Sequence, residues 1–203
     1  MRIGDTLTFD RYEWRVLDIQ NGNALILTEH MIMQRPYNNR AGGTTWAGCE
    51  LREYLNGEFY RSFDRTNRAR IVQVTNENPD NPWYGAAGGE DTLDHIFLLS
   101  LEEAVRKYFG DSSPNLDKRS PKQRYWFQKK DENNSRRVSK LDGRGWWWWL
   151  RSPGRDNKRA VYIWGNGVIG IQGNGTFHYN SNTIHPSTGD NSGGVRPALW
   201  LKL

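Results

Sequence analysis

A run of four tryptophans, Trp146 to Trp149, constrains the fold of this chain more than any other feature, because such large, flat side chains need a sizeable buried volume. The 203 residues include 10 Trp, 9 Tyr and 7 Phe, although only 36% of them are hydrophobic. We therefore expect an aromatic core and one domain that spans residues 1–203. The 21 glycines and 8 prolines predict many turns around that core.

Some classes of protein are excluded by what the sequence lacks. No window approaches the 18 consecutive apolar residues of a membrane span, and the first residues hold no apolar stretch of signal-peptide length. We therefore expect a cytoplasmic protein. Display on a surface or a virion is possible through a partner. The single cysteine, Cys49, excludes an internal disulfide and a cysteine-rich zinc site, and its position near Leu51 favours a small buried side chain over a nucleophile.

Catalytic and metal-binding motifs are also missing. The four histidines include no i, i+4 pair, and the chain has no glycine-rich phosphate loop and no serine nucleophile elbow. Glu90, Asp91 and Asp94 are acidic, but a solvated loop is favoured over a calcium site because an oxygen cage needs six or more ligands. The sequence thus predicts no enzyme activity, no cofactor and no metal site.

Hydrophobic periodicity predicts an α+β fold. Alternation over residues 6–27, with a hairpin turn at Asn21-Gly22, predicts an N-terminal β-meander. Apolar residues spaced by four from residue 51 to residue 59 predict a helical face, which Asn56-Gly57 is expected to break into two short helices. The other expected elements are a helix begun by a Ser100–Glu103 capping box, strands at 71–74, 96–99, 146–150, 160–164, 168–172 and 197–201, and turns at 165–167 and 173–175.

The two ends of the chain are expected to pair. Strand-like segments at residues 6–9 and 197–201 would otherwise leave exposed sheet edges. We therefore place both in one antiparallel sheet, with Leu199 and Leu201 facing the core beside Thr6 to Phe9.

Positive charge is concentrated in one segment. The net charge of the chain is +5, but residues 117–144 hold ten Lys/Arg against four acids around one apolar island, Tyr125-Trp126-Phe127. We interpret residues 115–143 as a basic insertion, a solvated loop that folding does not require and that only this island anchors. Non-specific nucleic-acid binding through Lys118–Arg144 is an open alternative, since interleaved basic and aromatic residues can contact phosphates and stack on bases.

Motifs along most of the chain outside the insertion resemble one family. They are WWLRSPG at 148–154, GVRPALWL at 194–201, YEWRVL at 12–17, LREYLN at 51–56 and IFLLS at 96–100. These motifs resemble a bacterial and archaeal family of C-type-lectin-like domains, which includes the variable proteins of diversity-generating retroelements. The resemblance implies a C-type-lectin-like fold with paired terminal strands, two or three short helices and a long loop-rich C-terminal half. It also implies a ligand-binding display scaffold whose hypervariable region precedes the final strand, here at about residues 155–192.

The composition of residues 157–191 is that of an adaptable binding face, rich in Asn, Gly, Ser, Thr and aromatic residues. The expected ligand-binding residues, for an unknown protein or glycan, are Asn157, Tyr162, Trp164, Asn166, Ile169, Ile171, Asn174, Phe177, His178, Tyr179 and Asn180. The expected structural frame is Trp148, Trp149, Arg151, Arg196 and Trp200, with the two arginines donating hydrogen bonds to loop carbonyls. If Asn and Gly serve hairpin turns alone, the chain is instead an invariant structural lectin-like module.

Overall fold

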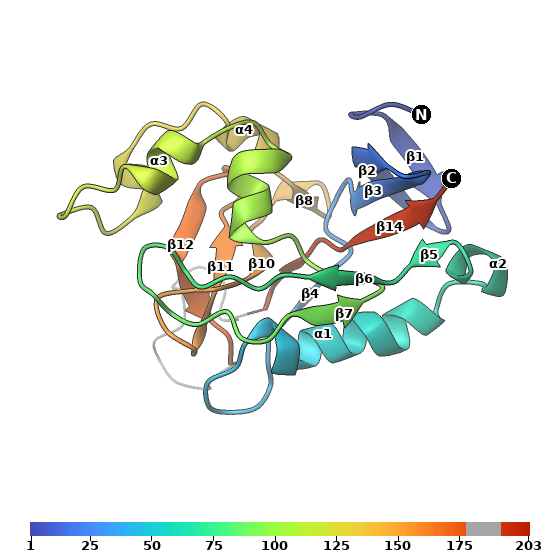
Figure 1. The fold of residues 1–203 in the computed structure, drawn as a ribbon, viewed down its shortest axis with the longest axis horizontal. Helices are drawn as coiled ribbons and strands as arrows, with labels where there is room; N and C mark the ends of the chain where they lie inside the picture. The colour runs from blue at the N-terminus through green and yellow to red at the C-terminus, as the bar shows by residue number, and fades with distance from the viewer. Residues whose placement is uncertain (178–191) are drawn as a thin grey trace.

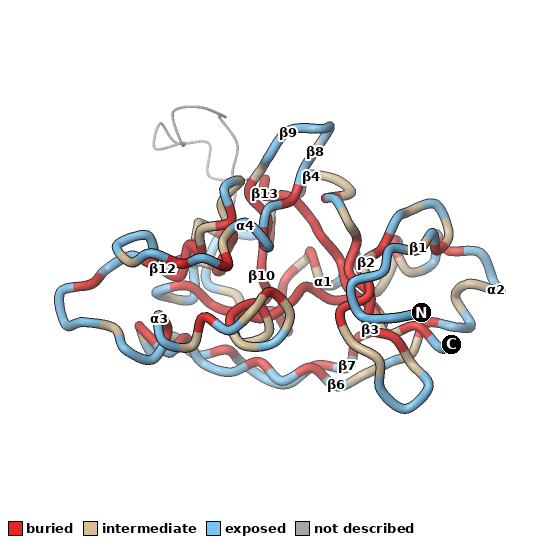
Figure 2. The backbone as a smooth tube through the Cα atoms, turned by 90° about the horizontal axis from the view of Figure 1, so that it is seen from above, coloured by how far each residue is buried: buried red, intermediate tan, exposed pale blue. Residues whose placement is uncertain are grey.

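The computed structural model describes residues 1–177 and 192–203 and has a mixed α+β fold, in which strands predominate over short helices (Figure 1). Two five-stranded sheets form the body, and two two-stranded sheets lie beside them. The N- and C-termini lie close together at one end of the molecule (Figure 1). Buried residues concentrate in the middle of the molecule, between the exposed loops at its two ends (Figure 2).

The first sheet contains both chain ends and has the strand order β1-β2-β3-β14-β5. Its strands are β1 (Thr6–Phe9), β2 (Tyr12–Gln20), β3 (Asn23–Thr28), β5 (Ile71–Val72) and β14 (Ala198–Lys202). Leu199 and Leu201 are buried as predicted, but the direct pairing of the last strand with Thr6–Phe9 is wrong. Because β2 already occupies one side of β3, β14 pairs with the other side of β3 and carries β5 beyond it.

The second sheet has the order β12-β11-β10-β13-β4, so four of its strands come from the C-terminal half of the chain and β4 comes from the N-terminal half. Its strands are β4 (Met33–Arg35), β10 (Trp148–Pro153), β11 (Arg159–Ile163), β12 (Ile169–Gly175) and β13 (Gly193–Val195). The turn expected at residues 173–175 is wrong, since Asn174 and Gly175 pair with Ala160 and Arg159 and so extend β12. The small sheets pair β6 (Val74–Asn76) with β7 (Thr92–Asp94), and β8 (Lys140–Leu141) with β9 (Arg144–Gly145).

The helical segments are all short. They are η1 (Trp46–Gly48), α1 (Glu50–Tyr54), η2 (Leu55–Phe59), α2 (Arg65–Arg68), η3 (Glu103–Lys107), α3 (Ser113–Asp117), η4 (Trp126–Gln128) and α4 (Asn134–Arg137). The predicted capping box is present, because Ser100 N donates to Glu103 Oε2 at 2.7 Å and Glu103 N donates to Ser100 Oγ at 3.1 Å. None of the helices within the described part of the chain is long and apolar enough to span a membrane.

The helical run through α1 and η2 is continuous, so the break predicted at Asn56-Gly57 is wrong. The Asn56 side chain accepts a hydrogen bond from His95 N at 2.7 Å and donates to the Ile96 carbonyl at 2.9 Å. These long-range bonds stabilise Asn56 within the helix and outweigh the turn preference of an Asn-Gly pair. They also fix the position of residues 96–99. These residues are buried as expected, but they form only one bridge, between Phe97 and Ala198, rather than a strand.

Buried tryptophans and arginines connect the elements around β10. Trp148 and Trp149 are fully buried, and their indole N–H groups donate to the carbonyls of Arg137 and Arg35. Arg151 donates to the Leu98 carbonyl at 2.8 Å. It also pairs with Glu103 at 2.6 Å, so β10 is locked to η3. Trp200, by contrast, is only half-buried against the core.

Arg196, which precedes β14, is buried without a carboxylate partner among the described residues. It donates to the carbonyls of Thr28 at 2.8 Å and Glu29 at 3.1 Å, and its guanidinium lies 5.1 Å from the centre of the Trp148 ring. Burial lowers the pKa of Arg196 to about 10. Arg151 and Arg196 thus play the role that the sequence predicts, with backbone carbonyls as acceptors.

Candidate ligand-binding surfaces

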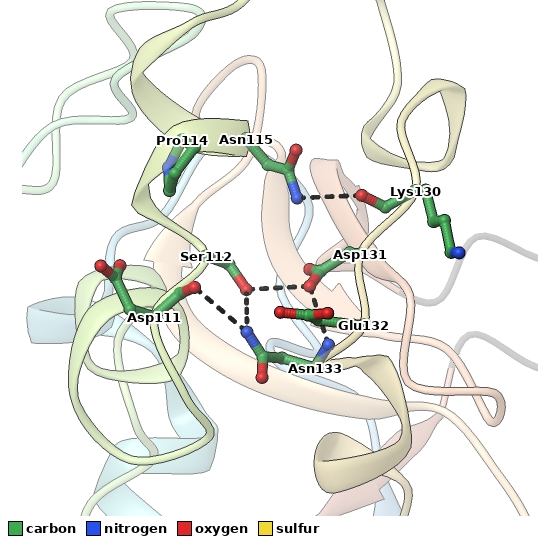
Figure 3. Close-up of a pocket in the computed structure, with 8 residues that line it drawn as sticks. All are labelled: Asp111, Ser112, Pro114, Asn115, Lys130, Asp131, Glu132 and Asn133. Atoms are coloured by element: carbon green, nitrogen blue, oxygen red, sulfur yellow. Dashed lines mark hydrogen bonds between the residues drawn. The ribbon is translucent and has the colours of Figure 1, made fainter.

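A buried polar cluster fixes the basic insertion to the body, and we call Ser112, Asp131 and Arg137 the insertion hub. Arg137 donates to Asp131 Oδ2 at 2.7 Å and to Ser112 Oγ at 2.6 Å, and Ser112 Oγ donates to Asp131 Oδ1 at 2.9 Å. Figure 3 shows Ser112, Asp131 and Asn133 converging in a pocket of about 250 Å³. Burial would raise the pKa of Asp131, but the hydrogen bonds and the charge of Arg137 outweigh it and hold that pKa below its ordinary value.

The insertion therefore differs from the solvated loop that its charge predicts. Of the three expected anchors only Trp126 is buried; its ring stacks on Trp83 with 5.9 Å between centroids, and its indole N–H donates to Asp131 at 2.9 Å. Tyr125 and Phe127 are 39% and 61% exposed. The hub could not be predicted from the sequence because Asp131 and Arg137 are ordinary surface residue types, and only the tertiary fold brings Ser112 between them.

The predicted ligand-binding residues are divided between the two ends of the β11–β12 hairpin. Trp164, half-buried, and Asn166, exposed, lie at the turn between these strands, where Asn166 Oδ1 accepts from Val168 N at 3.2 Å. Asn157, Asn174 and Phe177 belong to the other end, where Phe177 forms a bridge with Asn38. A seven-residue strand separates the groups by roughly 20 Å, so the expected single patch that joins Trp164 to Phe177 is wrong.

Three of the predicted ligand residues belong to the interior. Ile169 and Ile171 are buried in the core, as are Val161 and Ile163, so neither isoleucine is available to a ligand. Tyr162, which alternates with Val161 and Ile163 along β11, is buried as well. Its ring contacts those of Trp147 and Trp164, with centroids 5.4 Å and 5.1 Å away. His178, Tyr179 and Asn180 lie outside the described residues.

A hollow of about 400 Å³ is present at the end of the hairpin that carries Asn157, and we call it the Thr44–Asn157 hollow. It is lined by Gly43, Thr44, Thr45, Gly48 and Asn157. Thr44 N donates to the Asn157 carbonyl at 2.7 Å, which joins the two loops. A Cβ atom at Gly43 would lie 2.3 Å from the Asn157 carboxamide, so only glycine lets that side chain lie against the loop.

In the hollow, Thr44 Oγ1 donates to the Thr45 carbonyl at 3.1 Å, whereas the Asn157 carboxamide is open to a ligand. The Asn157 carboxamide makes no hydrogen bond to any residue within 1–177 or 192–203 and is exposed. Asn157 was predicted from the sequence, whereas Thr44 and Thr45 were not, because Gly42-Gly43 indicates only a turn and nothing in the periodicity links that turn to residue 157.

The groups considered for chemistry have structural roles. The Cys49 thiol is buried, which raises its pKa to about 12 and leaves no reactive thiolate at neutral pH. Asp94 is buried too and accepts hydrogen bonds from Arg52, Trp46 and Thr92. In the described ranges no three His, Cys, Asp or Glu side chains gather in a way that could hold a metal ion.

Comparisons with known proteins extend these observations. Neither the curated proteins nor the solved structures gave a match. A family model described as Domain of unknown function (DUF6273) matches residues 21–203, which include the second sheet, the insertion and the Thr44–Asn157 hollow. Because this match covers most of the chain, the protein belongs to the DUF6273 family.

Proposed function

We propose that this protein is a non-catalytic ligand-binding module with a C-type-lectin-like fold that displays a surface for a protein or a glycan. The first sheet supports that fold, because it holds both chain ends with β14 inside it. The short helices and the loop-rich C-terminal half support it as well. The buried, protonated Cys49 is in keeping with binding rather than covalent catalysis.

The Thr44–Asn157 hollow is the observation that carries this proposal. Its two loops are fixed through their backbones, since Thr44 N bonds to the Asn157 carbonyl and, nearby, Asn38 N donates to the Thr176 carbonyl at 2.8 Å. Its side chains end in hydroxyl and carboxamide groups, which both donate and accept hydrogen bonds. A fixed backbone that presents short, adaptable polar groups is the arrangement of a binding face.

The frame behind this face keeps its geometry independent of the ligand. Trp149 and Arg151 lie on β10, the strand that precedes Asn157 in the chain. Both are buried and hydrogen-bonded to distant carbonyls. Substitutions at Thr45 or Asn157 should therefore change binding without changing the fold. Of the predicted ligand residues, we retain Asn157, Asn174 and Phe177 for this face and exclude Trp164 and Asn166 from it.

Binding by the wild-type chain to an array of immobilised glycans tests the glycan form of this proposal. We expect Thr45→Val and Asn157→Leu to abolish the signals of the wild type, whereas Asn166→Ser, at the far end of the hairpin, should keep them. Melting curves establish that all three variants are folded. Glycan signals that persist in Asn157→Leu, or vanish equally in Asn166→Ser, would contradict the assignment of the hollow.

We further propose that the face is diversified, as in the variable proteins of diversity-generating retroelements. Asn157, Asn174 and Phe177 fall within the expected variable region of about 155–192. Sequencing the DNA downstream of the gene tests this form. A near-copy of the 3′ end that differs at adenines, beside a reverse-transcriptase gene, is the expected result. A locus without them would leave an invariant binding module.

A further inference from the structure

We propose that the loop of residues 118–130, which we call the cationic loop, binds single-stranded nucleic acid together with its neighbours Tyr84 and Arg155. This site shares no residue with the Thr44–Asn157 hollow, and it does not depend on the function proposed for that hollow. In Figure 1 the insertion lies over the β12 side of the second sheet, and η4 packs against β12.

The charge of the cationic loop is uncompensated. Its 13 residues contain six Lys/Arg and no Asp or Glu. No ion pair within 1–177 and 192–203 involves any of the six. Arg119 and Lys129 donate to carbonyls of Gln123 and Lys118. The other four side chains are exposed and make no hydrogen bond to a described residue; they are those of Lys118, Lys122, Arg124 and Lys130. Four exposed cations on one short loop match an anionic chain.

The loop is held in a defined shape before any ligand arrives. Gln128 Oε1 accepts hydrogen bonds from Arg124 N at 2.7 Å and Tyr125 N at 3.0 Å, and Tyr84 OH donates to the Arg124 carbonyl at 2.6 Å. Trp126 anchors the centre of the loop to Trp83 and to the insertion hub. A preorganised loop loses less conformational entropy when it binds.

Two aromatic rings project from this rigid loop. Tyr125 and Phe127 stack in parallel, with centroids 5.1 Å apart and an interplanar angle of 8°. Tyr125 is the less exposed of the two rings and lies near Tyr84 and Tyr162. Burial raises the pKa of Tyr84 and of Tyr162, and the Tyr125 phenol contributes to both increases. Phe127 is 61% exposed. An exposed flat ring surrounded by cations offers a stacking platform for a base, while the cations contact its phosphates.

Tyr84 and Arg155 extend this surface away from the loop. Arg119 lies 5.0 Å from the centre of the Tyr84 ring, and Arg155 N donates to the Gln172 carbonyl on β12 at 2.9 Å. The Arg155 side chain is exposed and lies 3.5 Å from the Asp156 carboxylate, a surface ion pair of the kind that contributes little to stability. Burial raises the pKa of Tyr84, and the charges of Arg119, Arg155 and Arg124 partly oppose this rise. The ligand would therefore follow a strip that runs from Phe127 over the edge of β12.

The exposed aromatic stack favours single strands over other polyanions. A base in a duplex is already stacked on both faces, so it cannot use the Phe127 ring. An acidic protein would neutralise the cations but would leave the flat ring without a matching partner. The combination of four free cations and a stacked pair thus selects an anionic chain with accessible bases.

Fluorescence anisotropy of labelled dT20 in 50 mM salt tests this proposal, with a 20-base-pair duplex and poly-L-glutamate as competitors. We expect dT20 to bind, and Phe127→Leu to weaken it about tenfold, while Phe127→Trp restores it. The triple variant K118Q/K122Q/K130Q should weaken binding and reduce the slope of log K against log salt by about 2, since each phosphate contact on a single strand contributes about 0.7.

The matched control is K140Q/R144Q/K202Q, which removes the same charge from exposed sites outside the loop and should bind nearly as the wild type does. Melting curves of every variant should agree within about 2 °C, which separates lost binding from lost folding. Three results would overturn the proposal: no dT20 binding by the wild type, equal loss in the control, or competition by poly-L-glutamate or duplex that equals unlabelled dT20.

Discussion

The frame around β10 and the cationic loop are both built from tryptophan and basic side chains, yet they place their cations in opposite environments. Arg151 and Arg196 are buried and bonded to carbonyls of distant segments. Lys122 and Arg124 are exposed, and the tryptophan beside them, Trp126, is buried. The comparison shows that residue type does not decide the role of an arginine here; what decides it is whether the fold supplies backbone acceptors around the guanidinium.

The insertion hub stands between these two cases. Arg137 is as buried as the frame arginines and, like Arg151, it has a carboxylate partner, Asp131, but it lies in the same insertion as the exposed cations. The insertion thus has a structural base and an exposed tip. A Cβ atom at Gly167 would lie 1.8 Å from the Asn134 carbonyl, so the β11–β12 turn packs directly on α4 in that base.

Removal of β14 should have the largest effect and would break the frame entirely. Deletion of residues 198–203 removes the strand between β3 and β5 together with buried Leu199 and Leu201. We expect no cooperative melting by circular dichroism. Deletion of exposed Leu203 alone is the control and should melt like the full chain; a six-residue truncation that melts cooperatively would show that the frame does not need β14.

Asp131→Ala should strongly destabilise the insertion. It leaves Arg137 buried without a counter-charge, which costs about 3–5 kcal/mol. Urea unfolding measures this loss. The neighbouring Glu132→Ala, at an exposed position, should change stability by less than about 0.5 kcal/mol. Equal stability of the two variants would restore the solvated-loop interpretation of the insertion.

Arg196→Met should have an intermediate effect, because it keeps the apolar volume beside Trp148 but leaves the Thr28 and Glu29 carbonyls without their donor. We expect a loss of about 1–3 kcal/mol in urea unfolding. Exposed Arg144→Met is the matched control. A neutral Arg196→Met would mean that the frame needs only the size of this side chain.

Acid should weaken the frame through Glu103. Burial would raise the pKa of Glu103, but the charge and hydrogen bonds of Arg151 outweigh it and hold that pKa below its ordinary value of 4.5. A lowered folded-state pKa gives stability that is present above the unfolded pKa and is lost as the pH falls through the folded pKa. The melting temperature should therefore decrease as the pH is lowered below 4.5. Glu103→Gln, although less stable at pH 7, should show a smaller decrease in melting temperature across that range.

The smallest effect is expected at the tip of the insertion. Phe127→Ala should change the unfolding free energy by less than about 0.5 kcal/mol, because the ring is mostly exposed. Trp126→Ala, one residue away, should cost about 3–5 kcal/mol, since it empties a buried site. Comparable losses in thermal or urea unfolding would show that Phe127 belongs to the core, which would also remove the stacking platform.

The local elements could be predicted from the amino-acid sequence alone. Alternation over residues 6–27 predicted the meander, and Asn21-Gly22 predicted its turn, where φ angles of 49° and 73° are observed. Ser100 and Glu103 predicted a capping box because both partners lie within one helical turn. Arg151 and Arg196 lie in the motifs WWLRSPG and GVRPALWL, and the sequence predicted them as frame residues that donate to carbonyls. The meander, its turn and the capping box depend on neighbours in the chain, which a sequence displays directly.

Contacts between distant segments could not be predicted in this way. The partner strands of β14, the helical conformation of Asn56, the insertion hub and the meeting of Thr44 with Asn157 all join residues that are far apart in the sequence. Alternation assigns a residue to one face of a strand but not to a depth, so Tyr162 could be placed opposite Val161 and still not be known as buried. Burial and long-range hydrogen bonding depend on what packs against each face, and that is settled only when all the elements assemble.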